Sequence, residues 1–139
     1  LMGWAAAFGR LDWPAVALYC GGILWTIGYD TIYAHQDKED DALVGVRSTA
    51  RLFGTWTKPA LAALYGGATV LFALALFGVD AGPAAFLGLA AGLAHLVWQI
   101  VRLDIDDPDQ CLKLFRSNTS YGWILFAGLV LDAMVQALL

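Results

Sequence analysis

The sequence predicts an all-α protein, a polytopic bundle of about four transmembrane helices with the tail of a preceding helix at its start. Two features of the composition carry this prediction: 60% of the 139 residues are hydrophobic, and only 14% are charged. An ordinary soluble domain of this size is less apolar. The third observation is that charge-free runs of about 20 residues, the length that crosses a bilayer, alternate with polar stretches.

The helices are expected in the following order. Residues 1–8 are apolar but too few to cross a membrane, so we interpret them as the end of a helix that begins outside this sequence. Pro14 can begin the next helix, because proline lacks the N–H that the first helical turn leaves unpaired. A tight turn at 80–83 makes the helices on either side of it antiparallel. Within a single domain, 1–139, the full spans are predicted at 14–36, 58–79, 82–102 and 120–138.

Two polar loops, 37–57 and 103–119, separate the predicted spans. Of the eight lysines and arginines, only Arg10 falls away from these loops. Because Lys and Arg favour the cytoplasmic side of membrane proteins, both loops are expected to face the cytoplasm or the mitochondrial matrix. The net charge of −4 and the lack of a basic patch argue against nucleic acid as a partner. The residues that set this orientation are Lys38, Arg47, Arg51, Lys58, Arg102, Lys113 and Arg116.

An acid-rich segment at 29–41 lies across the end of the first full span. Five acidic residues fall within twelve positions there. If the helix continues through the segment, Asp30, Asp37 and Asp41 share one face, because they lie seven and four positions apart. Asp30 then lies about 10 Å deeper along the axis than Asp37. A carboxylate at that depth is costly unless it is paired, hydrated or bound to a metal ion, so it is a candidate for function.

The spacing of Asp37 and Asp41, one helical turn apart, suits a shared divalent cation. Mg²⁺ is held by one or two carboxylates together with substrate phosphate oxygens and water, so it can join an acidic helix face to an anionic substrate. Neutralising a diphosphate makes it a better leaving group. We therefore expect Mg²⁺-assisted chemistry on a diphosphate, with an electron-rich acceptor capturing the allylic carbocation that develops.

The acid-rich segment also carries a resemblance to a known family. Tyr-Asp-Thr-Ile-Tyr-Ala-His-Gln-Asp-Lys-Glu-Asp-Asp is followed by Gly-Val-Arg-Ser-Thr-Ala at 45–50 and Leu-Phe-Gly at 52–54. These residues resemble the second aspartate-rich motif of the UbiA-type intramembrane prenyltransferases, and more narrowly the 4-hydroxybenzoate polyprenyltransferase branch. Cys-Leu-Lys-Leu-Phe-Arg-Ser-Asn at 111–118 is similar to the same branch.

The resemblance implies a helical membrane enzyme in which two aspartate motifs face each other across a cavity and bind Mg²⁺ and diphosphate. Asp37 and Asp41 match the DxxxD positions of the second motif, and Asp30 matches the aspartate before it, so these three are the expected catalytic residues and metal ligands. The family's first motif, of the type Asn-Asp-xx-Asp, is absent. The chain therefore resembles the C-terminal half of such an enzyme and is expected to be inactive alone, with the missing N-terminal half as its partner.

The reaction implied is transfer of a polyprenyl group from polyprenyl diphosphate to 4-hydroxybenzoate in ubiquinone biosynthesis, in a bacterial inner membrane or the mitochondrial inner membrane. Four residues near the polar loops are candidates for binding the diphosphate. The two loop arginines are equally well explained as contacts to lipid headgroups. For the other two, at the start of the last span, that simpler explanation is somewhat favoured. The four are Arg47, Arg51, Arg116 and Asn118.

Other functions remain open at this point. A prenyltransferase of the same superfamily with another acceptor, such as a haem, a naphthoate or homogentisate, would carry the same motif. A small membrane subunit that binds or transports cations would use Asp30 as an ion site. Such a subunit would have acidic residues at several depths in the membrane, whereas here the acidic residues cluster at the cytoplasmic end of the bundle.

Five further residues have simpler structural explanations. His35 is interpreted as an interfacial histidine and His95 as a buried, hydrogen-bonded one. Asp132 is expected to reach the opposite interface. Tyr29 and its neighbour one turn later, Tyr33, either line a cavity or pack between helices.

Overall fold

The computed structural model describes residues 1–36 and 49–138, with Arg51 described by its backbone alone, and every element in that part of the chain is helical. Four stretches within it, α2, η1 with α5, α6, and α7 with α8, are long and apolar enough to cross a membrane. The prediction of an all-α bundle with about four spans is confirmed. The elements are α1 (Met2–Phe8), α2 (Trp13–Ala34), α4 (Thr49–Phe53), η1 (Gly54–Trp56), α5 (Thr57–Gly78), α6 (Pro83–Arg102), α7 (Pro108–Arg116) and α8 (Asn118–Leu138).

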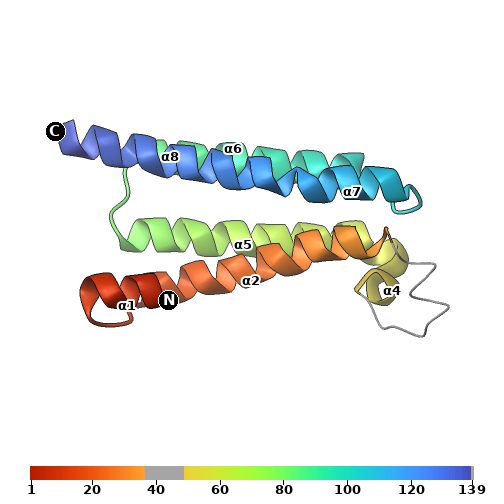
Figure 1. Cartoon of the computed structure of the whole chain (residues 1–139), viewed down its shortest axis with the longest axis horizontal. Helices are drawn as coiled ribbons and strands as arrows, with labels where there is room; N and C mark the ends of the chain where they lie inside the picture. Colours follow the sequence, from red (N-terminus) through yellow and green to blue (C-terminus); the bar gives the residue numbers. More distant parts are fainter. Residues whose placement is uncertain (37–48, 139) are drawn as a thin grey trace.

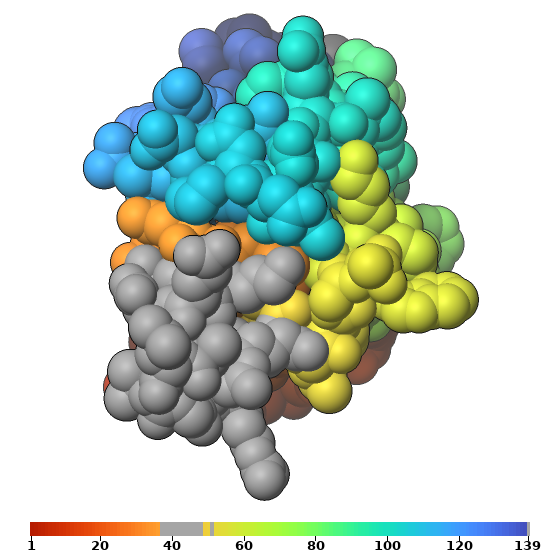
Figure 2. Space-filling model, turned by 90° about the vertical axis from the view of Figure 1, so that its right-hand side faces the viewer, coloured from red at the N-terminus to blue at the C-terminus, as the bar shows by residue number. Residues whose placement is uncertain are grey.

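The long helices form two layers of antiparallel pairs. Helix α2 packs along α5 in one layer, α6 packs along α8 in the other, and contacts between α5 and α6 join the layers (Figure 1). The end of α2, the start of α5 and the α6–α7 connection lie at the same end of the bundle, and the α1–α2 and α5–α6 turns lie at the opposite end. Figure 2 looks onto the first of these ends, where the cyan residues around the α6–α7 connection lie beside the orange end of α2.

Proline and glycine mark several of the helix boundaries. Pro14, Pro83 and Pro108 each lie in the first turn of a helix, where the N–H that proline lacks would have no partner. Gly9 ends α1 in the left-handed conformation, with φ of 67°, which costs glycine nothing because it has no Cβ. The four long helices begin and end within two residues of the expected spans, and α2 ends at Ala34 rather than Gln36.

The loop expected at 103–119 contains a helix that the sequence analysis missed. Helix α7 begins after Asp107, whose Oδ1 accepts a hydrogen bond from the backbone N–H of Gln110 at 3.0 Å. One face of the helix is buried through Cys111 and Leu114. Its charged residues drew the prediction toward a loop, but they lie on the other face of a short amphipathic helix.

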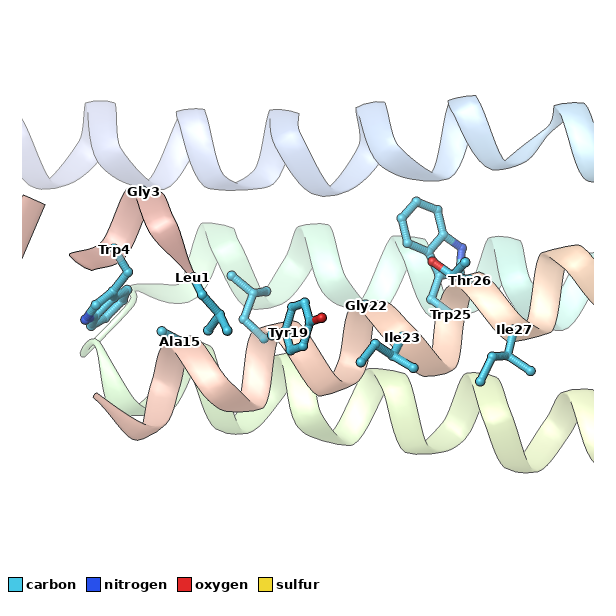
Figure 3. Close-up of a pocket in the computed structure, with 11 residues that line it drawn as sticks. Leu1, Gly3, Trp4, Ala15, Tyr19, Gly22, Ile23, Trp25, Thr26 and Ile27 are labelled. Carbon is cyan, nitrogen blue, oxygen red and sulfur yellow. The ribbon is translucent and has the colours of Figure 1, made fainter. Parts of the chain in front are cut away.

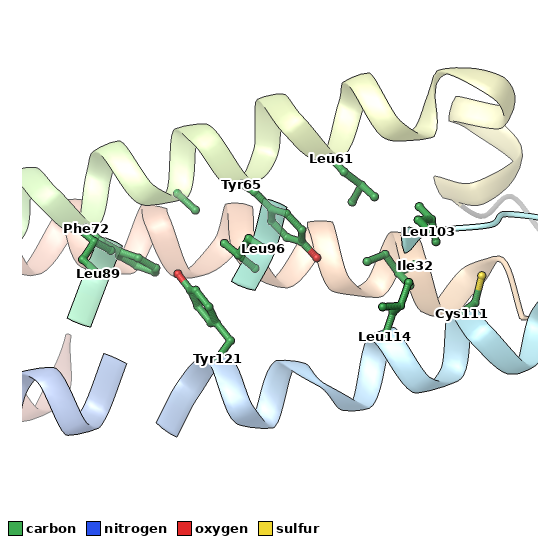
Figure 4. Close-up of a cluster of buried hydrophobic side chains, with 11 residues drawn as sticks. Ile32, Leu61, Tyr65, Phe72, Leu89, Leu96, Leu103, Cys111, Leu114 and Tyr121 are labelled. Carbon is green, nitrogen blue, oxygen red and sulfur yellow. The ribbon is translucent and has the colours of Figure 1, made fainter. Parts of the chain in front are cut away.

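The buried core joins the two layers through a column of apolar and aromatic side chains (Figure 4). Tyr65 and Tyr121 are fully buried near its middle. Glycines allow close approach on both sides of this core. A Cβ on Gly28 would lie 2.3 Å from the Tyr65 ring, and one on Gly88 would lie 2.7 Å from the Cα of Gly128. Gly28 thus lies at a close contact of α2 with α5, and Gly88 and Gly128 lie at a close contact of α6 with α8.

Asp132 does not extend to the interface as expected. Only 6% of it is exposed, and its carboxylate accepts hydrogen bonds from the backbone N–H of Gly82 at 2.8 Å and of Ala85 at 3.4 Å. Gln136 donates a third bond to the same carboxylate at 2.9 Å. Asp132 of α8 therefore caps the first turn of α6, where unpaired N–H groups and the helix dipole favour a negative charge.

Candidate functional site

The candidate site lies at the end of α2 that faces the polar connections, and Asp30 is its central described residue. Asp30 is on the helical part of the segment, and its side chain is exposed. Within residues 1–36 and 49–138 its carboxylate has no recorded hydrogen bond or ion pair. Exposed residues on neighbouring turns, Ile23, Ile27 and Tyr33, continue the same side of the helix. Asp30 is thus a carboxylate on an otherwise apolar, uncovered helix face.

The remaining carboxylates and loop arginines expected at this site lie beyond the helix. Asp37, Asp41 and Arg47 fall outside the described residues. Arg51 lies in α4, where only its backbone is described. Helix α2 ends at Ala34, and a turn follows at His35 and Gln36. The shared face of the three aspartates, which assumed a helix throughout, therefore stays a prediction.

His35, interpreted from the sequence as an interfacial residue, is buried between the end of α2 and the start of α5. Only 2% of it is exposed, and its Nε2 lies 2.9 Å from Oγ1 of Thr57, the first residue of α5. The Thr57 hydroxyl donates its hydrogen to the carbonyl of Gly54 at 2.7 Å, so His35 Nε2 must be the donor to Thr57. This chain of bonds ties the end of α2 to the start of α5.

Aromatic side chains join the Asp30 segment to α7 and α8. Trp25 lies with its ring centroid 4.9 Å from that of Tyr121 and 5.3 Å from that of Tyr29. Phe115 lies 5.8 Å from Tyr29 and 4.8 Å from Tyr33. Both tyrosines therefore contact another helix, which supports the packing explanation given for them above.

Two of the expected diphosphate ligands, Arg116 and Asn118, lie in different surroundings. Arg116 follows Phe115 at the end of α7 and is exposed, on the same end of the bundle as Asp30. Asn118 is buried, with 7% exposed. Its Oδ1 accepts a hydrogen bond from Trp25 Nε1 at 3.0 Å, and its Nδ2 donates to the carbonyls of Leu114 and Phe115. The structure thus leaves Arg116 exposed at the same end of the bundle as Asp30 and turns the Asn118 amide inward.

His95 belongs to a separate polar group between α6 and the start of α8. Its Nε2 lies 3.1 Å from the Ser117 carbonyl and 3.3 Å from the Ser117 hydroxyl. Gln99, fully buried one turn later, donates to the same hydroxyl at 2.9 Å. His95 is half-buried and hydrogen-bonded, close to what the sequence indicated.

An apolar cavity of about 620 Å³ lies along the same helix as Asp30 (Figure 3). Leu1 and Trp4 lie on its α1 side, and residues of α2 from Ala15 to Ile27 form its long wall. Ile27, at one end, precedes Asp30 by less than one helical turn. The cavity is lined almost wholly by apolar side chains, so it suits a hydrocarbon chain. A hydrocarbon trough that leads toward a carboxylate suits an amphiphile whose polar end is held through a cation.

The described residues alone do not complete a metal site. No group of three or more His, Cys, Asp or Glu side chains able to hold a metal ion occurs among them. Asp30 supplies one carboxylate, which fits Mg²⁺ because that ion takes one or two carboxylates and fills its remaining positions with phosphate oxygens and water. The second and third carboxylates of the expected set, Asp37 and Asp41, lie in the part that the structure does not describe.

Trp25 was not among the predicted site residues, and the structure places it between Asn118, Tyr29 and Tyr121. One signal was available: Trp25, Tyr29 and Tyr33 recur every four residues and so form an aromatic row on one side of a helix. The row indicates a contact with another helix. The sequence pattern does not show which residues, about 90 positions later in the chain, form the other side of that contact.

Comparison with known proteins agrees with this arrangement. The model of the UbiA prenyltransferase family matches residues 1–130. The chain is 48% identical to the 4-hydroxybenzoate polyprenyltransferase, mitochondrial, of Bos taurus over 141 residues, which cover 99% of this chain and 37% of that protein. It is 48% identical to the human protein of the same name, over 94% of this chain and 36% of that protein, and 45% identical to that of Arabidopsis thaliana.

The chain thus spans little more than a third of the length of these relatives. No solved structure matches it significantly. Since the family model matches nearly the whole chain, the chain belongs to the UbiA prenyltransferase family.

Proposed function

We propose that this chain forms part of a membrane enzyme that transfers a polyprenyl group from polyprenyl diphosphate to the aromatic ring of 4-hydroxybenzoate, a step of ubiquinone biosynthesis. The observation that carries the proposal is the exposed carboxylate of Asp30, which follows by three residues the last α2 residue that lines an apolar cavity, Ile27. Membership of the UbiA prenyltransferase family and relatives named 4-hydroxybenzoate polyprenyltransferase support the reaction and the acceptor.

The residues of this chain have different roles in the proposed reaction, according to the chemistry of their side chains. Asp30, Asp37 and Asp41 would hold Mg²⁺, which would neutralise the leaving diphosphate. The exposed guanidinium of Arg116 approaches the same anion, as do Arg47 and Arg51. In the reaction, the bond between the allylic carbon and the diphosphate oxygen breaks, a carbon–carbon bond to the ring forms, and the ring loses a proton.

The apolar cavity between α1 and α2 is the proposed binding site of the isoprenoid tail. Its walls are lined by aliphatic and aromatic side chains such as Leu18, Ile23 and Ile27, and its volume is about 620 Å³. Burying each CH₂ of a hydrocarbon tail contributes about 0.8 kcal/mol relative to water, so an apolar trough binds the tail while the polar end stays at Asp30. The reacting carbon is then held at the boundary between the two environments.

The proposed enzyme needs more chain than these 139 residues. The chain spans 37% of the length of its bovine relative, and the side of α2 that carries Asp30 is uncovered in the described structure. Further helices of the longer protein pack against this side and supply the first aspartate motif. Both polar connections face the cytoplasm or the matrix, in a bacterial inner membrane or the mitochondrial inner membrane.

The test uses the full-length protein that contains this chain, expressed in membranes and supplied with polyprenyl diphosphate, Mg²⁺ and labelled 4-hydroxybenzoate. Removing two ligands in Asp37→Ala with Asp41→Ala is expected to lower turnover at least about a hundredfold, because loss of one charge-stabilising group costs that much in other enzymes. The matched control is Asp40→Asn, which removes a neighbouring acid outside the proposed set and is expected to keep normal turnover.

Three outcomes would change the proposal. Normal turnover in the double variant would remove the assigned roles of Asp37 and Asp41. Prenyl transfer to a naphthoate, homogentisate or a haem but not to 4-hydroxybenzoate would show that the enzyme uses a different acceptor. Cation flux through reconstituted vesicles without any prenyl transfer would favour the cation-binding subunit, with Asp30 as its ion site.

A further inference from the structure

We propose that the hydrogen bond between Trp25 and Asn118 positions Asp30 relative to the end of α7 that carries Arg116. Asn118 would then act on the diphosphate site through Trp25, as a positioning residue, without contacting the substrate. This inference rests on the proposed prenyl transfer and assigns within it a role to two residues of α2 and α8.

The amide of Asn118 is held in one orientation by three partners. Its Nδ2 donates to the carbonyl of Phe115 at 3.0 Å and to that of Leu114 at 3.3 Å, and its Oδ1 accepts from Trp25 Nε1 at 3.0 Å. Two carbonyls can only accept and an indole N–H can only donate, so the partners themselves decide which amide atom faces which side. Both donor hydrogens of the amide are thereby used inside the protein.

That arrangement argues against Asn118 as a direct ligand of an anion. An anionic oxygen needs donors, and the two that Asn118 possesses point at Leu114 and Phe115. Turning the amide outward would break both of these bonds and leave the Trp25 N–H facing a donor or an empty space. Because the residue is buried, with 7% exposed, the groups left unpaired would not be fully compensated by water.

Trp25 connects this fixed amide to the candidate site. It precedes Asp30 by five residues in α2, and its ring also contacts Tyr29 and Tyr121. In Figure 3 the ring extends from α2 toward α8, away from the row of Ile23 and Ile27. A neighbouring side of α2 lies on α5, where Gly28, three residues after Trp25, accommodates the Tyr65 ring. Helix α2 is therefore held by α5 on one side and by Trp25 on the adjacent side, which sets its rotation.

The same contacts join the segment of α7 that carries Arg116 to the segment of α2 that carries Asp30. Phe115, which directly precedes Arg116, packs against Tyr29 and Tyr33, and these tyrosines flank Asp30 in the sequence. Asn118 is bonded to the Phe115 carbonyl as well as to Trp25. A change at Trp25 or Asn118 thus loosens the contact between the last turn of α7, which carries Arg116, and the segment of α2 that carries Asp30.

The experiment uses the full-length protein and a double-mutant cycle. Trp25→Phe keeps an aromatic ring but cannot donate, and Asn118→Leu keeps a similar volume but cannot accept. Each is expected to raise the KM for polyprenyl diphosphate about three- to twentyfold, the range that corresponds to loss of one interhelical hydrogen bond in a membrane protein. The KM for 4-hydroxybenzoate should stay unchanged. The double variant should be no worse than the more affected single variant, since both remove the same bond.

The matched control is Trp123→Phe, which makes the same exchange on an exposed tryptophan of α8. It is expected to leave both KM values unchanged. Thermal unfolding of each variant in detergent is measured alongside the kinetics, because a merely structural role would lower the unfolding temperature and the amount of active protein without raising the KM for one substrate.

Each other outcome contradicts the inference in a different way. Unchanged KM values in Trp25→Phe, in an otherwise active enzyme, would overturn it and leave the proposed function intact. A large effect of Asn118→Leu with none of Trp25→Phe would make Asn118 a direct ligand. If the KM increases of the two single variants multiplied in the double variant, Trp25 and Asn118 would have independent roles, which contradicts the inference. Absence of prenyl transfer in the unmodified protein would overturn both the inference and the function on which it rests.

Discussion

A side chain added at the contact between α6 and α8 should separate these helices. Gly88 and Gly128 face each other so closely that a Cβ on Gly128 would lie 2.7 Å from the Gly88 Cα and 3.3 Å from the carbonyl oxygen of Ala84. The first distance is about 0.8 Å shorter than the normal carbon–carbon contact of about 3.5 Å. Backbone atoms form the obstacle, so no rotamer change can relieve the clash and the helix axes must move apart.

The cost follows from how membrane helices associate. Lipid tails are as apolar as leucine, so packing between small residues supplies much of the attraction between α6 and α8. Gly128→Ala is therefore expected to lower the free energy of unfolding by about 1–3 kcal/mol, the usual range for an overpacked contact. The same change at Gly122, also in α8, meets nothing within 4 Å. Gly122→Ala should leave stability unchanged or raise it by up to about 1 kcal/mol, because alanine favours helices over glycine.

The assay is reversible unfolding of the full-length protein in mixed micelles, followed by helix content. A Gly128→Ala protein as stable as Gly122→Ala would refute the claim that these helices touch through their backbones. The double variant Gly88→Ala with Gly128→Ala provides a second check. Once one methyl has separated the helices, the second meets less resistance, so the combined loss should be smaller than the two single losses added together.

Two other stability changes follow from buried polar contacts. Asp132→Ala removes the cap on the first turn of α6 and should cost about 1–2 kcal/mol in the same unfolding assay; an unchanged midpoint would show that the carboxylate is not bonded there. Thr57→Val leaves His35 Nε2 without its acceptor and should cost about 1–3 kcal/mol, whereas Thr57→Ser keeps the hydroxyl and should cost much less. Equal losses in the two Thr57 variants would place the effect in packing and not in the hydrogen bond.

The fold class was predictable because hydrophobic length and charge position decide it locally. A charge-free run such as 59–79 has no alternative to a helix in lipid, where every backbone N–H and C=O must be paired within the segment. The prolines at 14 and 83 then mark where helices begin. Helix α7 escaped prediction because its nine residues are too few for hydropathy to detect, and its pattern only has meaning once a neighbour covers Cys111 and Leu114.

The candidate site was predictable in its chemistry but not in its contacts. Asp30 stands out in the sequence because an acid interrupts an apolar run, and the structure leaves it exposed on α2. His35 and Asn118 were assigned to an interface and to a substrate, whereas both are buried and bonded to residues 22 and 93 positions away. Sequence shows that a side chain can form a hydrogen bond, but its partner depends on which helices become neighbours.

Comparison of the polar side chains within the spans gives an independent reason to place function at Asp30. Asp132 is bonded to the start of α6, Asn118 to Trp25, and His35 to Thr57. Each of these hydrogen bonds joins two helices, as expected where lipid offers no partner for a polar group. Asp30 is the exception among these residues, because its carboxylate is exposed and makes no recorded bond within the described chain. A carboxylate inside a span that does not stabilise the bundle needs another partner, and an apolar cavity that leads to it indicates that the partner arrives with a hydrocarbon chain.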